Sequence, residues 1–175
     1  MKDDGGNTRD FSTMHTNTSS LLGGPQTLTI EDVASMAGAT IEEVRDFWVA
    51  MGFPSPQSEE KIFTENDAKL FLQWSTFMAS GAIDTATARS LLRANSHLAD
   101  RLGLWQVEAI VEDTMRRFGL DDTAARMYVL DHIRERVDVL EDVLRHSWRR
   151  QLDALLKRMD HEISTRGHEG LQPRF

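Results

Sequence analysis

Cysteine is absent from this chain of 175 residues, which excludes disulfide bonds, thiol nucleophiles and metal sites held by cysteine. Proline and glycine are scarce, with 4 and 11 copies, and several of them fall early in the chain. Leu, Ala, Asp, Glu and Arg dominate the remainder, a mixture that favours helices. No segment alternates apolar and polar residues convincingly, as a half-buried strand does. The composition therefore predicts an all-α fold.

Long apolar runs are also missing. No stretch approaches the ~20 residues that cross a bilayer, and the first residues lack the apolar core of a signal peptide. The formal net charge is −8, which disfavours non-specific attraction to nucleic-acid phosphates or to anionic lipid. We therefore expect a cytoplasmic protein that does not take nucleic acid as a partner.

Catalytic signatures are absent as well. The chain has no Gly-x-Ser-x-Gly elbow, and no glycine-rich phosphate loop followed by Lys and then Ser or Thr. Its carboxylate pairs are spread over helical patterns and indicate solvated surfaces. We predict no catalytic residue, no metal site and no cofactor, so this chain is not expected to be an enzyme by itself.

Changes in composition divide the chain into four parts. Residues 1–26 are rich in Gly, Ser, Thr, Asn and Asp and are predicted to be a disordered arm. Residues 27–81 are predicted to form a small helix-turn-helix head. Residues 82–165 are predicted to be a long-helix region that dimerises and regulates. Residues 166–175 are interpreted as a tail or a linker.

Threonines mark the starts of the helices in and after the head. Thr29, Thr40 and Thr64 are each expected to cap a helix, and Asp32 and Glu43 follow the first two at the distance of a capping box. The apolar spacing that follows each threonine predicts which side chains face the core. The predicted inner face of the first two helices consists of Ile30, Val33, Met36, Ile41, Val44, Phe47 and Trp48.

Longer helical patterns follow these two short helices. Helices are expected over 64–79, still within the head, and over 84–117, and one nearly unbroken pattern runs from about 123 to 163. Its apolar residues recur in steps of three or four and share one helix face. They are Leu130, Ile133, Val137, Leu140, Leu144, Trp148, Leu152, Leu155, Met159 and Ile163.

A stripe of that length is more than a small domain buries alone, which predicts pairing with a second copy of the chain. The long helices are therefore expected to form an intertwined dimeric helical bundle. The contacts of its dimer and switch helix are predicted at Leu140, Leu144, Trp148, Leu152, Leu155 and Met159.

Three histidines lie in the same long pattern, and their spacings of 14 and 15 residues are close to whole numbers of helical turns. They are His132, His146 and His161. Because histidine titrates between pH 5 and 8, they are candidate pH sensors. The alternative interpretation is that they are solvent-facing residues of a polar stripe.

A set of large apolar residues has two interpretations. They form either packed core or the lining of a site for an acyl chain or another apolar ligand, since helical bundles hold ligands between their helices. The residues are Phe71, Trp74, Phe77, Trp105 and Ile110.

One pattern in the head combines the helix caps, the glycine turns and the apolar positions around them. Its residues are Thr29, Ile30, Val33, Ala34, Gly38, Thr40, Val44, Arg45, Trp48, Gly52, Phe53, Pro56, Phe63, Thr64 and Asp67. With this pattern the head resembles the start of a MerR-type winged-helix DNA-binding domain. The charge departs from that family, because residues 29–69 contain nine acidic and three basic side chains. A major-groove helix brings Arg or Lys to phosphates and base edges. The head is therefore interpreted as a degenerate MerR-like segment kept for packing.

A second resemblance covers nearly all of the predicted helical region. The order of elements, with segments 29–34, 63–68 and 148–152, is similar to the N-terminal regulatory domain of actinobacterial, mycobacterial-type class III adenylyl cyclases. This resemblance implies a homodimer that precedes a cyclase catalytic domain in the same chain and restrains it through the last helix. It also implies control by pH or by an apolar ligand such as a fatty acid. The catalytic signature, two metal-binding aspartates on a βαβ-type sheet, is absent here.

Two other functions remain open from the residues. One is a stand-alone MerR-like DNA-binding transcriptional regulator, which would bind a palindromic duplex in a salt-dependent way. The other is a dimeric scaffold that binds an acyl ligand without an attached enzyme.

Overall fold

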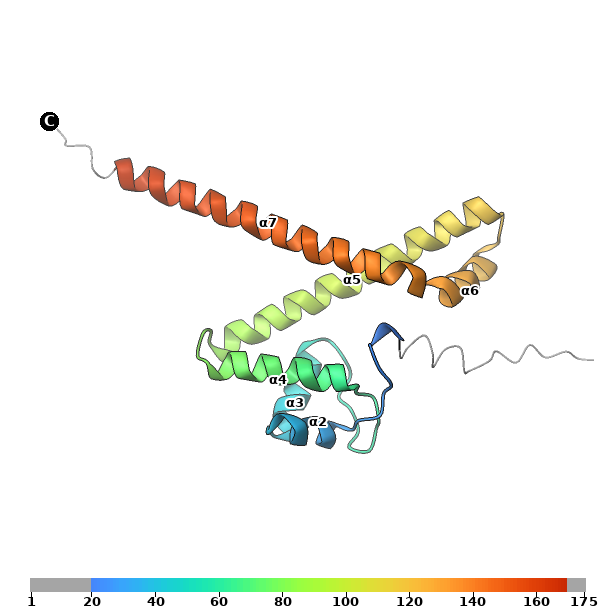
Figure 1. Cartoon of the computed structure of the whole chain (residues 1–175), viewed down its shortest axis with the longest axis horizontal. Coiled ribbons are helices and arrows are strands. Elements are labelled where there is room, and N and C mark those ends of the chain that lie inside the picture. The colour runs from blue at the N-terminus through green and yellow to red at the C-terminus, as the bar shows by residue number, and fades with distance from the viewer. Residues whose placement is uncertain (1–19, 170–175) are drawn as a thin grey trace, which may run out of the picture. The chain divides into compact units, whose positions relative to one another are not determined.

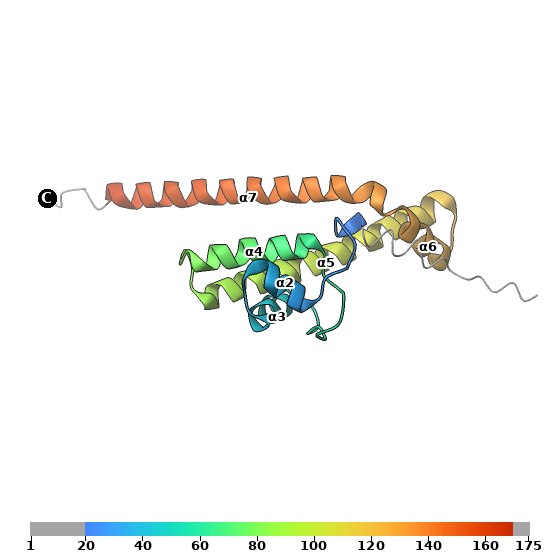
Figure 2. The same ribbon diagram turned by 60° about the horizontal axis from the view of Figure 1, so that its bottom comes forward.

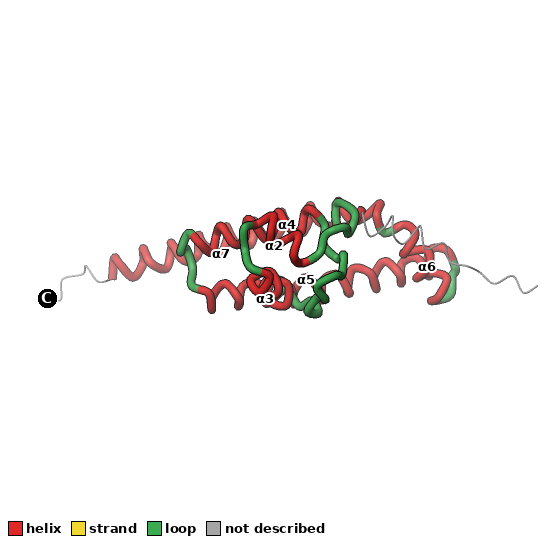
Figure 3. Tube along the Cα trace, turned by 90° about the horizontal axis from the view of Figure 1, so that it is seen from below, coloured by secondary structure: helices red, strands yellow, loops and turns green. Residues whose placement is uncertain are grey.

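The computed structural model describes residues 20–169. The described chain consists of six helices, labelled α2 to α7, and their loops, which confirms the predicted all-α class (Figures 1 and 3). The predicted arm and the end of the predicted tail lie largely outside the described residues. The chain divides into two compact units, Met1–His132 and Ile133–Phe175, and each is described by itself.

The first two helices are short and are joined by a tight turn. Helices α2 (Ile30–Ala37) and α3 (Ile41–Ala50) each begin at a complete capping box, formed by Thr29 with Asp32 and by Thr40 with Glu43. Gly38 ends α2 in the left-handed conformation, with φ 62°, which glycine adopts without steric cost. The spacing of three residues between each threonine and its acidic partner therefore predicted both helix starts correctly.

Helix α4 (Glu65–Ala79) begins at a third capping box, in which Thr64 pairs with Asp67. The residue before this cap pairs with the segment before α2. Backbone N–H groups of Leu28 and Phe63 each donate to the other's carbonyl, at 3.0 and 3.1 Å, in an isolated antiparallel bridge. This pair of bonds ties the starts of α2 and α4 together.

The core of the head lies between α2, α3 and α4. Phe47 and Phe71 meet edge to face there, with ring centroids 5.4 Å apart. Met36 and Phe77 were expected inside but are 54% and 40% exposed, because each lies on the outer side of its helix. The buried cluster consists of Ile30, Val33, Ala34, Val44, Phe47, Phe63, Ala68 and Phe71.

Helix α5 (Thr85–Phe118) is long and continuous. It begins at the cap Asp84 and ends at Gly119, whose φ is 64°. Gly103 does not interrupt it. The head contacts α5 near its start, and α6 (Asp122–His132) folds back on its far part (Figure 2).

Small and β-branched side chains are buried where α5 packs against α6. Ala125 and Val129 of α6 and Val111 of α5 are buried. Arg126 adds a forked ion pair to Glu108, with N–O distances of 2.7 and 2.9 Å. These contacts place α6 in the same unit as the head.

The single helix predicted over 123–163 is wrong. The helix is interrupted at Ile133, which lies in a turn, and α7 (Arg134–Glu169) begins after it. At the break the His132 ring donates from Nδ1 to the Tyr128 carbonyl at 2.8 Å, since a carbonyl oxygen only accepts. After the break the backbone makes a tight turn, in which the Arg136 N–H donates to the Ile133 carbonyl at 3.0 Å. Neither proline nor glycine marks this end.

Candidate functional site

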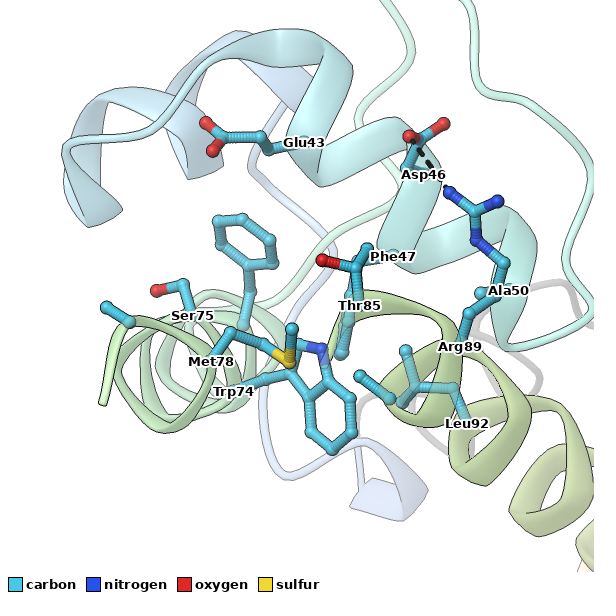
Figure 4. A pocket seen from close by; sticks show the side chains of 13 residues that line it. Glu43, Asp46, Phe47, Ala50, Trp74, Ser75, Met78, Thr85, Arg89 and Leu92 are labelled. Carbon is cyan, nitrogen blue, oxygen red and sulfur yellow. Dashed lines mark ion pairs between the residues drawn. The ribbon is translucent and has the colours of Figure 1, made fainter. Parts of the chain in front are cut away.

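A groove of about 420 Å³ opens between α3, α4 and α5. Figure 4 shows Phe47 of α3, Trp74 and Met78 of α4 and Leu92 of α5 around it. The Phe47 and Trp74 rings are 6.2 Å apart and tilted. The walls are therefore mostly apolar and come from three separate elements.

Charged side chains stand at the edge of this groove. Arg89 of α5 and Asp46 of α3 approach to 3.8 Å, and both side chains are more than half exposed. An ion pair so exposed contributes little to stability. Its effect is to give the rim of an apolar groove one cation and one anion.

A second groove of about 910 Å³ adjoins the first and shares Phe47, Ala50, Trp74 and Leu92 with it. Its remaining lining includes apolar residues of the turn after α3 and polar residues of α5. The polar residues on α5 are Arg93, Asn95, Ser96, His97 and Asp100.

The turn after α3 is fastened to α5 beside this second groove. Ser96 Oγ donates a hydrogen bond to the Met51 carbonyl. Gly52 follows with φ 90°, and a Cβ built on it would lie 2.8 Å from Ser96 Oγ. Glycine is required there because of both its backbone conformation and this close approach.

Two of the five predicted ligand-lining residues belong to these grooves. Phe71 and Trp74 line the first one, and Trp74 also lines the second. Phe77, Trp105 and Ile110 lie outside both, and Trp105 is 64% exposed. Sequence reasoning assigned Phe47 to packing alone and missed Leu92, which shares a helix face with Ala88 at four-residue spacing.

Helix α7 carries the predicted dimer and switch residues, and they face solvent. Leu140 is half-buried, and every described side chain from Glu141 to Arg166 is exposed. Trp148 is 61% exposed. From Leu144 onward, the part of the predicted stripe on α7 is therefore an apolar surface that the second unit does not cover by itself.

The three candidate pH sensors fall on two helices. His132 ends α6, where its ring stacks on Tyr128 at 4.0 Å. His146 and His161 lie on α7 and are exposed. Because α6 ends at His132 and a new helix carries His146 and His161, the predicted run of three histidines along one helix is not formed.

Carboxylates at the helix starts are held in their charged form. Hydrogen bonds from the Thr29 backbone and hydroxyl lower the pKa of Asp32, and those from Thr40 lower the pKa of Glu43. Arg45, a cation of the supposed recognition helix, pairs with Glu42 at 3.0 Å. The α3 start therefore presents negative charge.

Two other kinds of site, a metal centre and a membrane span, are not found in residues 20–169. No group of three or more His, Asp or Glu side chains there is arranged to hold a metal ion. None of the helices in that range combines the length and the apolar character that crossing a bilayer requires.

Comparison with known proteins adds the decisive observation. The chain is 37% identical over 145 residues to a protein of Glutamicibacter nicotianae named adenylate cyclase. It is 26% identical over 136 residues to a Streptomyces coelicolor protein with the same name. The chain is related to adenylate cyclases. No protein-family model matches it.

The matches to these adenylate cyclases are uneven in coverage. They take in 83% and 77% of this chain but only 36% and 35% of the two relatives. The chain thus spans about a third of the length of the curated relatives it matches.

Proposed function

We propose that this chain is the regulatory segment of a cytoplasmic class III adenylate cyclase and that it makes no cyclic AMP by itself. The observation that carries the proposal is the coverage. The match fills most of this chain and about a third of each adenylate cyclase. An all-helical segment without a recognisable catalytic constellation is suited to control rather than to chemistry.

The segment acts as a homodimer through α7. The exposed apolar stripe from Leu144 to Met159 supports this part of the proposal, because such a surface is stabilised when a partner covers it. A shift of paired α7 helices repositions the two cyclase catalytic domains attached in the same chains. The resting pair restrains those domains, so the segment is autoinhibitory.

Two stimuli fit the described surfaces. The larger groove joins apolar walls to Arg93 and His97, which suits a fatty acid whose carboxylate meets the cation. Protons are the other stimulus, read by His132 at the end of α6 or by the exposed His146 and His161 of α7.

Stand-alone DNA binding is not favoured. Helix α3 begins with Glu42 and Glu43, and Arg45 is engaged by Glu42. Phosphates would meet like charge there. The helices of the head instead serve to fasten it to α5.

The test begins in the source cells. An antibody raised against residues 20–169 should detect a polypeptide well above 19.9 kDa, and the captured protein should convert ATP to cyclic AMP. The same protein lacking those residues should have a higher rate. A polypeptide of 19.9 kDa without cyclase activity in the captured material would overturn the proposal.

A further inference from the structure

The apolar stripe of α7 repeats every eleven residues. Eleven residues make three turns of an α-helix almost without remainder, whereas a seven-residue repeat falls short of two turns. Three series show the spacing, namely Val137–Trp148–Met159, Ile133–Leu144–Leu155 and Leu152–Ile163. The stripe therefore runs nearly straight along α7 and drifts in the sense opposite to that of a heptad stripe.

A seven-residue repeat does not describe this helix. Heptad spacing fits Val137, Leu140 and Leu144 and then fails, because it continues onto polar positions. Those positions are Ser147, Gln151, Arg158 and His161. A left-handed coiled coil over the whole of α7 would bury these four side chains and leave Leu152 and Ile163 outside.

We propose that the stripe is the contact surface for α7 of a second copy, in a parallel pair that is straight or slightly right-handed. This rests on the proposed function of the chain as a dimeric segment and adds the geometry of the pair. The stripe residues from Leu144 to Ile163 are between 39% and 68% exposed. At about 80 Å² for each of these six side chains, two copies cover on the order of 1,000 Å², which is near the lower limit for a specific interface.

The parallel arrangement follows from the proposed function. A parallel pair sends both chains onward in the same direction, as two attached catalytic domains require.

The outer face of α7, opposite the stripe, carries two histidines beside the exposed Val139 and Val143. His146 and His161 lie about half a turn away from the stripe, and both are exposed. A second copy on the stripe therefore leaves these two imidazoles uncovered. The pairing surface and any proton-sensing histidine of α7 are then on opposite sides of the helix.

Single-cysteine cross-linking of the whole chain tests the proposal, because the chain has no cysteine of its own. Under mild oxidation, V137C, L152C and I163C should form disulfide-linked dimers at least tenfold faster than Q151C and R158C. Self-linking at both Val137 and Ile163 requires a parallel pair. H161C is an outer-face control and should remain monomeric.

The other outcomes are distinct. Linking of Q151C and R158C as fast as L152C would mean a heptad pair and would overturn the eleven-residue geometry, while the dimer of the proposed function would stand. Linking confined to positions near the middle of α7 would mean an antiparallel pair. A chain that is monomeric in sedimentation and does not link at any position would overturn the pairing itself. The cyclic AMP assay is independent of all three results.

Discussion

Replacing Gly52 with alanine should loosen the attachment of the head to α5. Two costs add at this position. A residue with a Cβ pays about 1–2 kcal/mol to hold a left-handed conformation such as φ 90°. The new Cβ would also lie 2.8 Å from Ser96 Oγ, so the hydroxyl must leave the Met51 carbonyl, at about 1 kcal/mol for the lost hydrogen bond. We expect the free energy of unfolding to fall by about 2–3 kcal/mol in total.

Two other glycines provide matched controls. Gly38 has φ 62° and no atom within 4 Å of an added Cβ, so Gly38→Ala should show the backbone cost alone. Gly103 lies inside α5, also with open space around it, and Gly103→Ala should raise stability by up to about 1 kcal/mol.

Urea unfolding followed by tryptophan fluorescence measures all three glycine variants. The contact itself is isolated by Ser96→Ala, since combining it with Gly52→Ala should cost less than the two single changes added together. If Gly52→Ala matched Gly38→Ala and the combined variant were simply additive, the turn after α3 would not press on α5, and the reasoning would be refuted.

Three further outcomes are expected. Trp148→Ala should weaken the dimer by about 2 kcal/mol per copy, while His146→Ala on the outer face should not; equal dissociation constants for both in sedimentation equilibrium would contradict the α7 interface. The lowered pKa of Glu43 means that its contribution is present above its ordinary value of 4.5 and is lost as the pH falls through the lower folded value. Below pH 4.5, the thermal unfolding temperature should therefore fall less steeply with pH for Glu43→Gln than for the unchanged chain. Identical dependence of the unfolding temperature on pH would show that the capping carboxylate does not cause the loss. Arg126→Met should cost no more than about 1 kcal/mol in urea unfolding, because its ion pairs with Glu108 are half exposed, and the cost should shrink in high salt; a larger, salt-independent loss would mean that the aliphatic stem matters more than the charge.

Helix starts were predictable because their causes are local. A capping box needs a threonine and an acid three residues apart, so Thr29, Thr40 and Thr64 announce their helices within a few residues. Gly38 and Gly119 announce the ends of α2 and α5 in the same way, through a conformation that other residues adopt at a cost. For these helices the local sequence is sufficient to predict the ends named here.

Other features depend on what packs against them. The apolar steps pass from Leu130 to Ile133 and on to Val137 without a change, so they contain no sign that α6 ends and α7 begins. The break follows directly after the helix that packs against α5, and the apolar steps do not reveal that contact. Likewise, apolar character favours burial of Trp105 but does not say which side of α5 has a neighbour. The grooves combine residues from three helices, and their membership follows from tertiary packing alone.

The length of α5 gives small movements of the head a large effect. Its 34 residues extend for about 50 Å, and glycine at one interior position does not bend them. The turn after α3 is bonded to this helix at Ser96, about 33 Å before its last residue Phe118, and α6 packs on the far part. A tilt of α5 by about 5° about Ser96 would carry Phe118 through roughly 3 Å, about half the rise of one helical turn. A ligand that does no more than wedge α3 away from α5 therefore has the leverage to displace α6 by a distance that neighbouring side chains can register.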